Sequence, residues 1–180
     1  MGILSEVPSQ SLTTRFRDRH RQIMDLFPAE LPGSAKERRA TSQVLFADLG
    51  SRVIIRSAVA PSQHVDGLRS VTERRTPAAG TRVTLRAFVN PVRRLRGGGI
   101  RPVDDIEEWF AERAAPALDD VDILATHRRN THTGRSNLII EQIDAAATIT
   151  NHDALDELLH DGLGRGKSFG CGLILIGAAA

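Results

Sequence analysis

The stretch LIIEQIDAAATITNHDALDELLH, residues 138–160, contains the two repeating patterns on which the prediction of the fold depends. Its first half holds two short segments rich in isoleucine, leucine and threonine, at residues 138–143 and 147–150, which are typical of strands. Between residues 153 and 160 the apolar residues are Leu155, Leu158 and Leu159, whose spacing places them on one face of a helix. A strand is therefore followed directly by a helix, as in mixed α+β domains.

The same succession of strands and helices extends in both directions along the chain. Strands are predicted at residues 2–7, 44–48, 53–60, 82–90, 121–125 and 173–176, and helices at 12–27, near 64–69 and from Asp104 or Asp105 to about 115. Each half thus interleaves strands with helices, which predicts an α+β fold of two tandem ferredoxin-like (RRM-like, β-α-β-β-α-β) domains. Gly97, Gly98 and Gly99 predict the boundary between a first domain at 1–96 and a second at 100–180.

Composition excludes several classes of protein. The chain has 180 residues, of which 41% are apolar, so it is long enough to bury a core. It contains no tyrosine, which excludes a catalytic tyrosine, and Cys171 is its single cysteine, which excludes an internal disulfide and a cysteine-based zinc site. No apolar run approaches the roughly 20 residues of a membrane span, and residues 1–11 lack the pattern of a signal peptide. We expect a cytoplasmic protein without a membrane partner.

The distribution of charge is more informative than the net charge of +2. Basic residues gather at positions 15–21, 69–101 and 127–135, whereas acidic residues gather at 104–112, 119–122 and 153–161. Any one basic cluster is explained most simply as a solvated surface whose arginines pair with acids. Three such clusters together favour a polyanionic partner.

The run GLGRGKSFGCGL at residues 162–173 is rich in glycine and resembles a phosphate-binding loop only superficially. The nucleotide-binding motif needs a glycine five positions before its Gly-Lys pair, where this chain has Asp161. The run also follows a helix and precedes a strand, the reverse of the order in a phosphate-binding loop. We therefore expect no nucleotide cofactor. Gly162 is explained as a helix C-cap, and the remaining glycines, with Arg165 and Lys167, would let the backbone approach a phosphodiester.

The glycine-rich run resembles the C-terminal signature of CasE, the CRISPR-associated endoribonuclease family of Cascade (type I-E) systems. Two further segments are similar to the family in the same order. His20-Arg21, ahead of Leu26-Phe27-Pro28, resembles the N-terminal helix that carries the catalytic histidine. Leu85-Arg86-Ala87 through Asn90-Pro91, followed by Arg93-Arg94, resembles the central strand motif, so that the resemblance covers nearly the whole chain.

The resemblance implies a metal-independent enzyme that cuts precursor CRISPR RNA beside the repeat hairpin. A ribose 2′-hydroxyl attacks the neighbouring phosphate and leaves a 2′,3′-cyclic phosphate, and the protein stays bound to its product as a Cascade subunit. Histidine suits proton transfer at neutral pH, so His20 is the predicted catalytic residue. Neighbouring cations would lower the pKa of His20 and stabilise the charge of the transition state.

The chain departs from the family at one catalytic position. Many relatives carry a tyrosine one helical turn before the histidine, where this chain has Arg17. Catalysis is therefore expected to rely on His20 together with Arg17 or Lys167, and turnover is expected to be slow. A catalytically weak or inactive RNA-binding subunit of the same complex is the alternative. A ferredoxin-like structural or small-ligand protein without an RNA partner is a third reading.

The expected partners are the CRISPR repeat RNA hairpin and the other Cascade subunits, and no cofactor or metal is expected. The predicted RNA-binding residues are Arg21, Arg86, Arg93, Arg94, Arg128, Arg129, Arg135, Gly164, Arg165, Gly166 and Ser168. The basic segment 127–135 is predicted to be a hairpin tip that enters or flanks the groove of the RNA stem, or else an unstructured polar loop. His127 and His132 lack neighbouring carboxylates or thiols and are not predicted to bind a metal.

Overall fold

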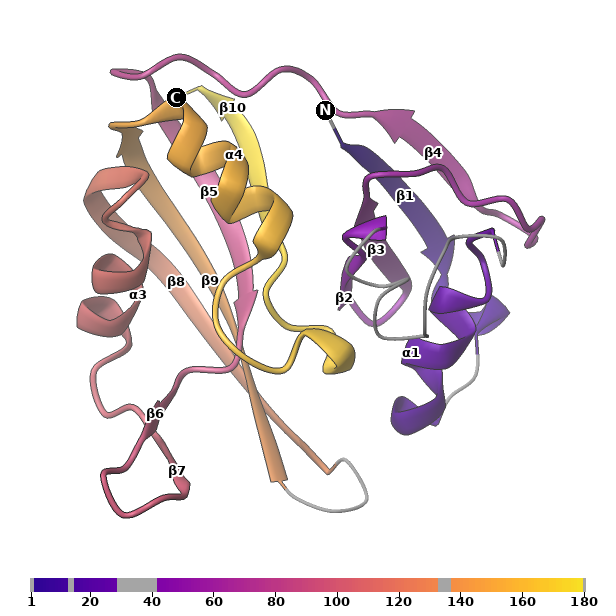
Figure 1. The fold of residues 1–180 in the computed structure, drawn as a ribbon, viewed down its shortest axis with the longest axis horizontal. Coiled ribbons are helices and arrows are strands. Elements are labelled where there is room, and N and C mark those ends of the chain that lie inside the picture. The colour runs from indigo at the N-terminus through magenta and orange to yellow at the C-terminus, as the bar shows by residue number, and fades with distance from the viewer. Residues whose placement is uncertain (1, 13–14, 29–41, 133–136, 180) are drawn as a thin grey trace. The chain divides into compact units, whose positions relative to one another are not determined.

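The computed structural model describes residues 2–12, 15–28, 42–132 and 137–179. The chain divides into two compact units. The first comprises Met1–Arg75 together with Ser168–Gly170, and the second comprises Thr76–Lys167 together with Cys171–Ala180. Each unit contains one four-stranded antiparallel sheet (Figure 1).

The first unit has the predicted ferredoxin-like order of strands. Its elements are β1 (Ile3–Pro8), a short 3-10 turn (Ser9–Ser11), α1 (Phe16–Met24), β2 (Leu45–Asp48), β3 (Arg52–Ser57) and β4 (Arg69–Thr72). The sheet has the order β2-β3-β1-β4, so the first and third strands of the unit lie in the centre. This is the strand order of a ferredoxin-like sheet, although the described residues between β3 and β4 contain no helix. The first strand, predicted at residues 2–7, is therefore present as β1.

The helix predicted near residues 64–69 is wrong. Residues 58–68 contain no helix, and Arg69 begins β4. Gly67 has a φ of +79°, and a Cβ atom there would lie 2.6 Å from Pro8 Cγ. A left-handed glycine packed this closely interrupts a helix, while Val65 and Leu68 still pack on the core of the unit.

Helix α1 is shorter than the predicted segment at residues 12–27. Ile23, Leu26 and Phe27 are all buried, but only Ile23 lies within the helix. The amide of Leu26 donates to the carbonyl of Ile23 at 3.1 Å, so the chain tightens into a turn beyond the helix. This turn carries Leu26 and Phe27 into the same core as Val53 and Ile55 of β3.

The second unit repeats the arrangement with one insertion. Its elements are β5 (Arg82–Val89), β6 (Val92–Arg94), β7 (Ile100–Pro102), α3 (Ile106–Ala114), β8 (Leu118–His132), β9 (Asn137–Ile149), α4 (His152–Asp161) and β10 (Ile174–Ala179). Between α4 and β10 in the chain, a 3-10 turn (Lys167–Phe169) begins in this unit and continues into the Ser168–Gly170 segment of the first. The sheet order is β10-β5-β9-β8, and β6 and β7 form a separate hairpin. Asp105 and Asn151 cap α3 and α4 by accepting from the amides of Glu108 and Ala154. No helix in these described ranges is long and apolar enough to cross a membrane.

The structure divides the chain earlier than the predicted boundary at Gly97–Gly99. Strand β5 pairs with both β9 and β10 and so belongs to the second unit, which begins at Thr76. The three glycines lie in the turn between β6 and β7, where Gly98 and Gly99 have φ values of +86° and +90°. Glycine supplies the left-handed backbone that this turn needs, so it marks a hairpin here and not a linker.

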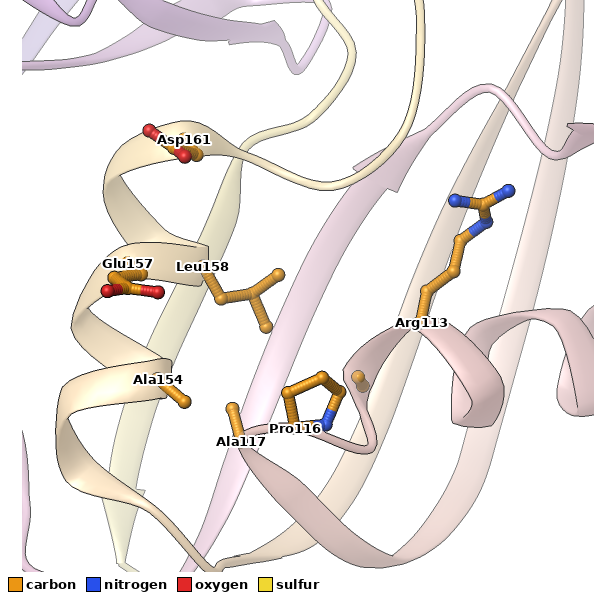
Figure 2. A pocket seen from close by; sticks show the side chains of 8 residues that line it. Arg113, Pro116, Ala117, Ala154, Glu157, Leu158 and Asp161 are labelled. Atoms are coloured by element: carbon orange, nitrogen blue, oxygen red, sulfur yellow. The ribbon is translucent and has the colours of Figure 1, made fainter.

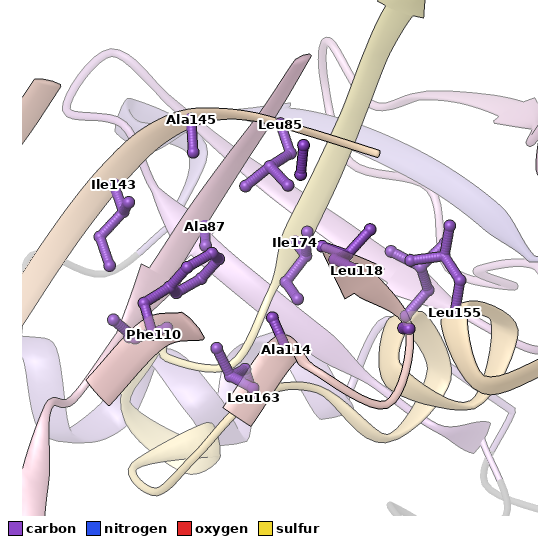
Figure 3. Close-up of a cluster of buried hydrophobic side chains, with 14 of the residues drawn as sticks. Leu85, Ala87, Phe110, Ala114, Leu118, Ile143, Ala145, Leu155, Leu163 and Ile174 are labelled. Carbon is purple, nitrogen blue, oxygen red and sulfur yellow. The ribbon is translucent and has the colours of Figure 1, made fainter. Parts of the chain in front are cut away.

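The core of the second unit lies between the sheet and the two helices (Figure 3). Phe110 of α3 and Leu155 of α4 are completely buried against it. On β9, Ile143, Ala145 and Ala147 are buried at every second position, as the alternation of a strand requires. Strand β9 runs without interruption from Asn137 to Ile149 and so joins the two strand segments predicted at 138–143 and 147–150.

Candidate functional site

His20 lies in α1, partly buried, with its ring stacked on Phe46 of β2. The ring centroids are 6.1 Å apart and the planes are inclined by 18°. Phe46 is 2% exposed and is a member of the core of the first unit. A fixed aromatic surface therefore holds one face of the imidazole, which limits the directions in which its nitrogens can point.

The tip of the glycine-rich run contacts the same aromatic ring. Ser168–Gly170 belongs to the first unit, and Gly170 has a φ of +76°. A Cβ atom at Gly170 would lie 3.1 Å from Phe46 Cε2, which is closer than an ordinary contact. Glycine thus allows the backbone to approach Phe46. The side chain of Phe46 therefore contacts both His20 and the glycine-rich run.

The arginines near His20 in sequence differ in their surroundings. Arg19 is 8% exposed and forms an ion pair with Asp48 of β2. The side chain of Arg21 is 75% exposed and pairs with Asp18 at 3.2 Å. Arg17 lies in α1, but its side chain is outside the described part of the chain. Arg19 is therefore a structural residue, whereas Arg21 remains accessible to a ligand.

In the second unit the glycine-rich run forms a closed loop. The amide of Leu163 donates to Gly172 at 2.9 Å, and the amide of Cys171 donates to Gly166 at 3.3 Å. Gly164 and Gly166 both have positive φ, and a Cβ atom at Gly166 would lie 3.3 Å from Cys171 Sγ. Gly162 ends α4 through a bond from its amide to Leu158, as the C-cap interpretation predicted. The loop therefore has a defined path that depends on glycine.

The side chains of this loop are exposed to different degrees. Arg165 is exposed and forms no ion pair with any residue that the structure describes. Lys167 and Ser168 are partly buried and lie in the 3-10 turn Lys167–Phe169. Both engage in interactions within the protein. Arg165 is consequently the side chain of the loop that is best placed to meet an anion.

The predicted basic hairpin is largely regular strand. Residues 127–132 of β8 pair with residues 137–142 of β9, and Arg135 lies outside the described residues. Nε of Arg128 donates to Glu141 at 2.6 Å, and Glu141 is 3% exposed. Arg129 is exposed, and its side chain emerges from the opposite face of the strand.

The positive charge of Arg129 acts on the thiol of Cys171, which lies in the glycine-rich run. Burial raises the pKa of Cys171 to about 12, and the positive charge of Arg129 acts in the opposite direction. Cys171 is fully buried and lies three residues before β10. Arg129 therefore lies within electrostatic range of the loop, while Arg128 is held by Glu141.

The remaining predicted arginines lie on β5 and β6. Arg86 donates to both oxygens of Asp144, at 2.5 and 2.9 Å. These hydrogen bonds are the main reason that the pKa of Asp144 is lowered and that of Arg86 is raised. Arg93 pairs with Glu108 and Glu112 of α3. Arg94 is exposed and has no ion-pair partner among the described residues.

Sequence reasoning missed Phe46 and Asp48 as residues that organise the site. Both lie in the strand predicted at 44–48, and their spacing of two places them on one face of it. No local pattern indicates that this face receives His20 and Arg19, because the contacts join segments more than 20 residues apart. In the described ranges, no group of three or more His, Cys, Asp or Glu residues is arranged to hold a metal ion.

The fold and these contacts define a class of protein: tandem ferredoxin-like units in which a helical histidine and a glycine-rich run contact one aromatic side chain. A family model described as CRISPR associated protein matches residues 4–177. The chain belongs to this CRISPR-associated family, which confirms the recognition made from the glycine-rich run and His20.

Solved structures of similar fold cover almost the whole chain. CRISPR endoribonuclease Cse3 bound to a 19-nucleotide RNA gives a TM-score of 0.75 at 15% identity, over 98% of this chain and 99% of that one. Cas6e from Escherichia coli K-12 gives 0.68 at 19% identity, over 98% of each chain. A chain from a CRISPR RNA-guided surveillance complex gives 0.64 at 22% identity, again over 98% of each. A search of curated proteins finds no significant match.

Proposed function

We propose that the protein is an endoribonuclease that processes CRISPR precursor RNA and remains bound to the product as a Cascade subunit in the cytoplasm. The family assignment and the likeness of its fold to an RNA-bound endoribonuclease support this proposal. The observation that carries it is the position of His20, which is stacked on Phe46 in the unit that also receives Gly170. An RNA strand that contacts Ser168–Gly170 would thus pass near the imidazole within the first unit.

In the proposed reaction, neutral His20 accepts the proton of a ribose 2′-hydroxyl beside the repeat hairpin. The 2′-oxygen attacks the adjacent phosphorus, and the bond from phosphorus to the 5′-oxygen breaks. The products are a 2′,3′-cyclic phosphate and a 5′-hydroxyl, whose oxygen takes a proton from Lys167 or from the imidazolium. Arg17 and Lys167 are proposed to stabilise the negative charge of the phosphorane. The reaction needs no redox step and no metal ion.

RNA binding is assigned to arginines of α1, β5, β6 and the β8–β9 hairpin and to residues of the glycine-rich run. The proposed contacts remain Arg21, Arg86, Arg93, Arg94, Arg128, Arg129, Arg135, Gly164, Arg165, Gly166 and Ser168. Arg165 and Arg94 have the greatest freedom to meet phosphates, because no described carboxylate neutralises them. Arg86 would have to leave Asp144, and Arg128 would have to leave Glu141, before either could bind a phosphate oxygen. The cost of breaking these ion pairs lowers their net contribution to RNA affinity.

Incubation of the protein with cognate repeat RNA in excess EDTA tests the proposed reaction. We expect cleavage at one position and a mass that corresponds to a cyclic phosphate, because the 2′-hydroxyl is the nucleophile. A substrate with a single 2′-deoxy nucleotide at the scissile position is expected to bind equally and to remain intact. Cleavage of that substrate, or dependence of the reaction on added Mg²⁺, would contradict the mechanism.

Substitution of the exposed arginines tests the proposed RNA surface. Arg165→Gln and Arg129→Gln are each expected to weaken RNA binding about 3- to 10-fold and to reduce the salt slope by about 1, since each loses a phosphate contact. Filter binding at several salt concentrations measures both quantities. Arg52→Gln is the matched control, because Arg52 is also exposed but pairs with Glu6 at 3.2 Å in the first unit. An equal loss of affinity in all three variants would indicate a nonspecific effect of charge and remove the proposed surface.

A binding-only subunit is the second candidate function. Two observations favour it: the chain has no tyrosine, and the cations that flank His20 are paired with Asp48 and Asp18. In that case the wild-type protein would bind repeat RNA tightly and leave it uncut under all conditions. The EDTA experiment separates the two candidates, because it measures binding and cleavage on the same RNA.

A further inference from the structure

Helices α3 and α4 of the second unit border an open groove of about 220 Å³ (Figure 2). Its apolar lining comes from Ala114 at the end of α3, from Pro116 and Ala117 in the turn that follows, and from Ala154 and Leu158 of α4. Three of these five side chains are single methyl groups, which are too short to fill the space between the helices. The groove is smaller than the roughly 300–1,000 Å³ of typical small-molecule sites, and it suits a single anchoring side chain of a protein partner.

The rim of the groove on α4 carries two exposed carboxylates, Glu157 and Asp161. They lie one helical turn apart, and neither forms an ion pair within the part of the chain that the structure describes. Like charges at this spacing destabilise a helix, and Asp161 also lies at the C-terminal end, where the helix dipole is negative. This edge is therefore electrostatically unsatisfied and favours a cation.

The opposite wall carries Arg113, which does not neutralise these carboxylates. Its guanidinium lies over the ring of Trp109, 4.9 Å from the ring centroid. Trp109 is 1% exposed, so its ring is a fixed support for this arginine. The groove thus has an apolar floor, an acidic rim and a cationic opposite wall.

We propose that this groove is a docking site for another protein subunit, which inserts an aliphatic side chain and places an arginine or lysine between Glu157 and Asp161. This inference rests on the proposed function, which supplies the neighbouring subunits. The partner is a protein and not RNA, because the rim carboxylates repel phosphates and the apolar floor offers no donors to them. Complementary charge across such a rim directs association, and the aliphatic anchor supplies most of the affinity.

Glu157→Arg is expected to weaken association at least tenfold, because it replaces an attraction with a repulsion. The binding probe is the surveillance complex assembled from the co-expressed remaining subunits and purified without this chain, immobilised for biolayer interferometry. Ala154→Leu fills the groove and is expected to cause a similar loss. Glu107→Arg is the control, since Glu107 is an exposed residue of α3 outside the groove and undergoes the same change of charge.

Site-specific cross-linking provides a second measurement that does not depend on folding energies. Cys171 is buried and its pKa is raised to about 12, so an introduced Asp161→Cys thiol reacts selectively with a maleimide photo-cross-linker. We expect Asp161→Cys, but not Glu107→Cys, to cross-link to one subunit of the complex. Unfolding curves and RNA affinity of all variants should match the wild type.

Each other outcome has a definite meaning. If Glu157→Arg and Ala154→Leu associate with the complex as the wild type does, and both still cleave RNA, the proposed docking site is wrong. Self-association of the isolated chain that Glu157→Arg abolishes, measured by sedimentation, assigns the groove to a second copy and overturns the subunit proposal. A selective loss of RNA affinity would assign it to RNA. Absence of cleavage by the wild type is a failure of the proposed function and leaves the association assay interpretable.

Discussion

Replacement of His20 by alanine is expected to lower the rate of repeat-RNA cleavage by about 10²- to 10⁴-fold, the usual contribution of a positioned acid–base group. RNA affinity should change little, because the substitution removes only the imidazole stacked on Phe46 and leaves in place every arginine that is proposed to bind phosphate. Single-turnover cleavage with protein in excess measures the rate separately from binding. A rate within threefold of the wild type would remove His20 from the mechanism.

Two further variants make this result specific to the site. His64→Ala removes a histidine of the same unit whose side chain is 92% exposed, and cleavage is expected to be unaffected. Phe46→Leu keeps an apolar side chain but removes the stacked ring. As Phe46 is a positioning residue, its loss should lower the cleavage rate and alter the pH–rate profile while RNA affinity is retained. A loss of binding and cleavage together would indicate a structural role alone.

The second large effect concerns the stability of the first unit. Arg56 of β3 is 2% exposed, and it donates to both carboxylate oxygens of Glu73 at 2.9 and 2.6 Å. Glu73→Ala leaves this guanidinium buried without its carboxylate, and we expect a loss of about 3–5 kcal/mol in the free energy of unfolding. Urea denaturation followed by circular dichroism measures the change.

An exposed pair in the same sheet supplies the control for that measurement. Arg52 of β3 pairs with Glu6 of β1 at 3.2 Å, and their side chains are 51% and 44% exposed. Glu6→Ala is expected to cost about 1 kcal/mol or less, because water screens the pair. Equal losses in Glu73→Ala and Glu6→Ala would show that burial does not govern the contribution of these ion pairs.

Much of the fold could be predicted because its signals are local. Apolar patterns predict β2 and β5 close to their observed bounds, whereas the strand predicted at 53–60 ends at Ser57. Of the two aspartates predicted as alternative caps of α3, Asp105 is the one that caps it. The predictions of the fold are wrong where a local sequence pattern is compatible with two structures. Glycines at 97–99 are compatible with both a linker and a hairpin turn, and only the pairing of β5 with β9 and β10 decides between them. The absence of a helix at residues 58–68 depends on Gly67 packing against Pro8, a contact across the unit.

The candidate site could be predicted in its residue types but not in its contacts. The family resemblance indicates His20 and the glycine-rich run, and both are present in the expected elements. Nothing in the sequence shows that Phe46 contacts both of them. The basic segment 127–135 was predicted to be a hairpin tip or a polar loop, but its described part is regular strand, in which Arg128 and Arg129 face opposite sides and Arg128 pairs with Glu141.

By itself, the sequence determined the class of fold, the family and the candidate catalytic residue, because periodicity, helix caps and the glycine-rich run are all local patterns. The tertiary structure decided which arginines are available to a polyanion. Arg19 pairs with Asp48 and Arg86 with Asp144, whereas Arg165 meets no carboxylate among the described residues. The physical reason is that the availability of a charge depends on the acid that folding brings beside it, and these partners lie 29 and 58 positions away along the chain.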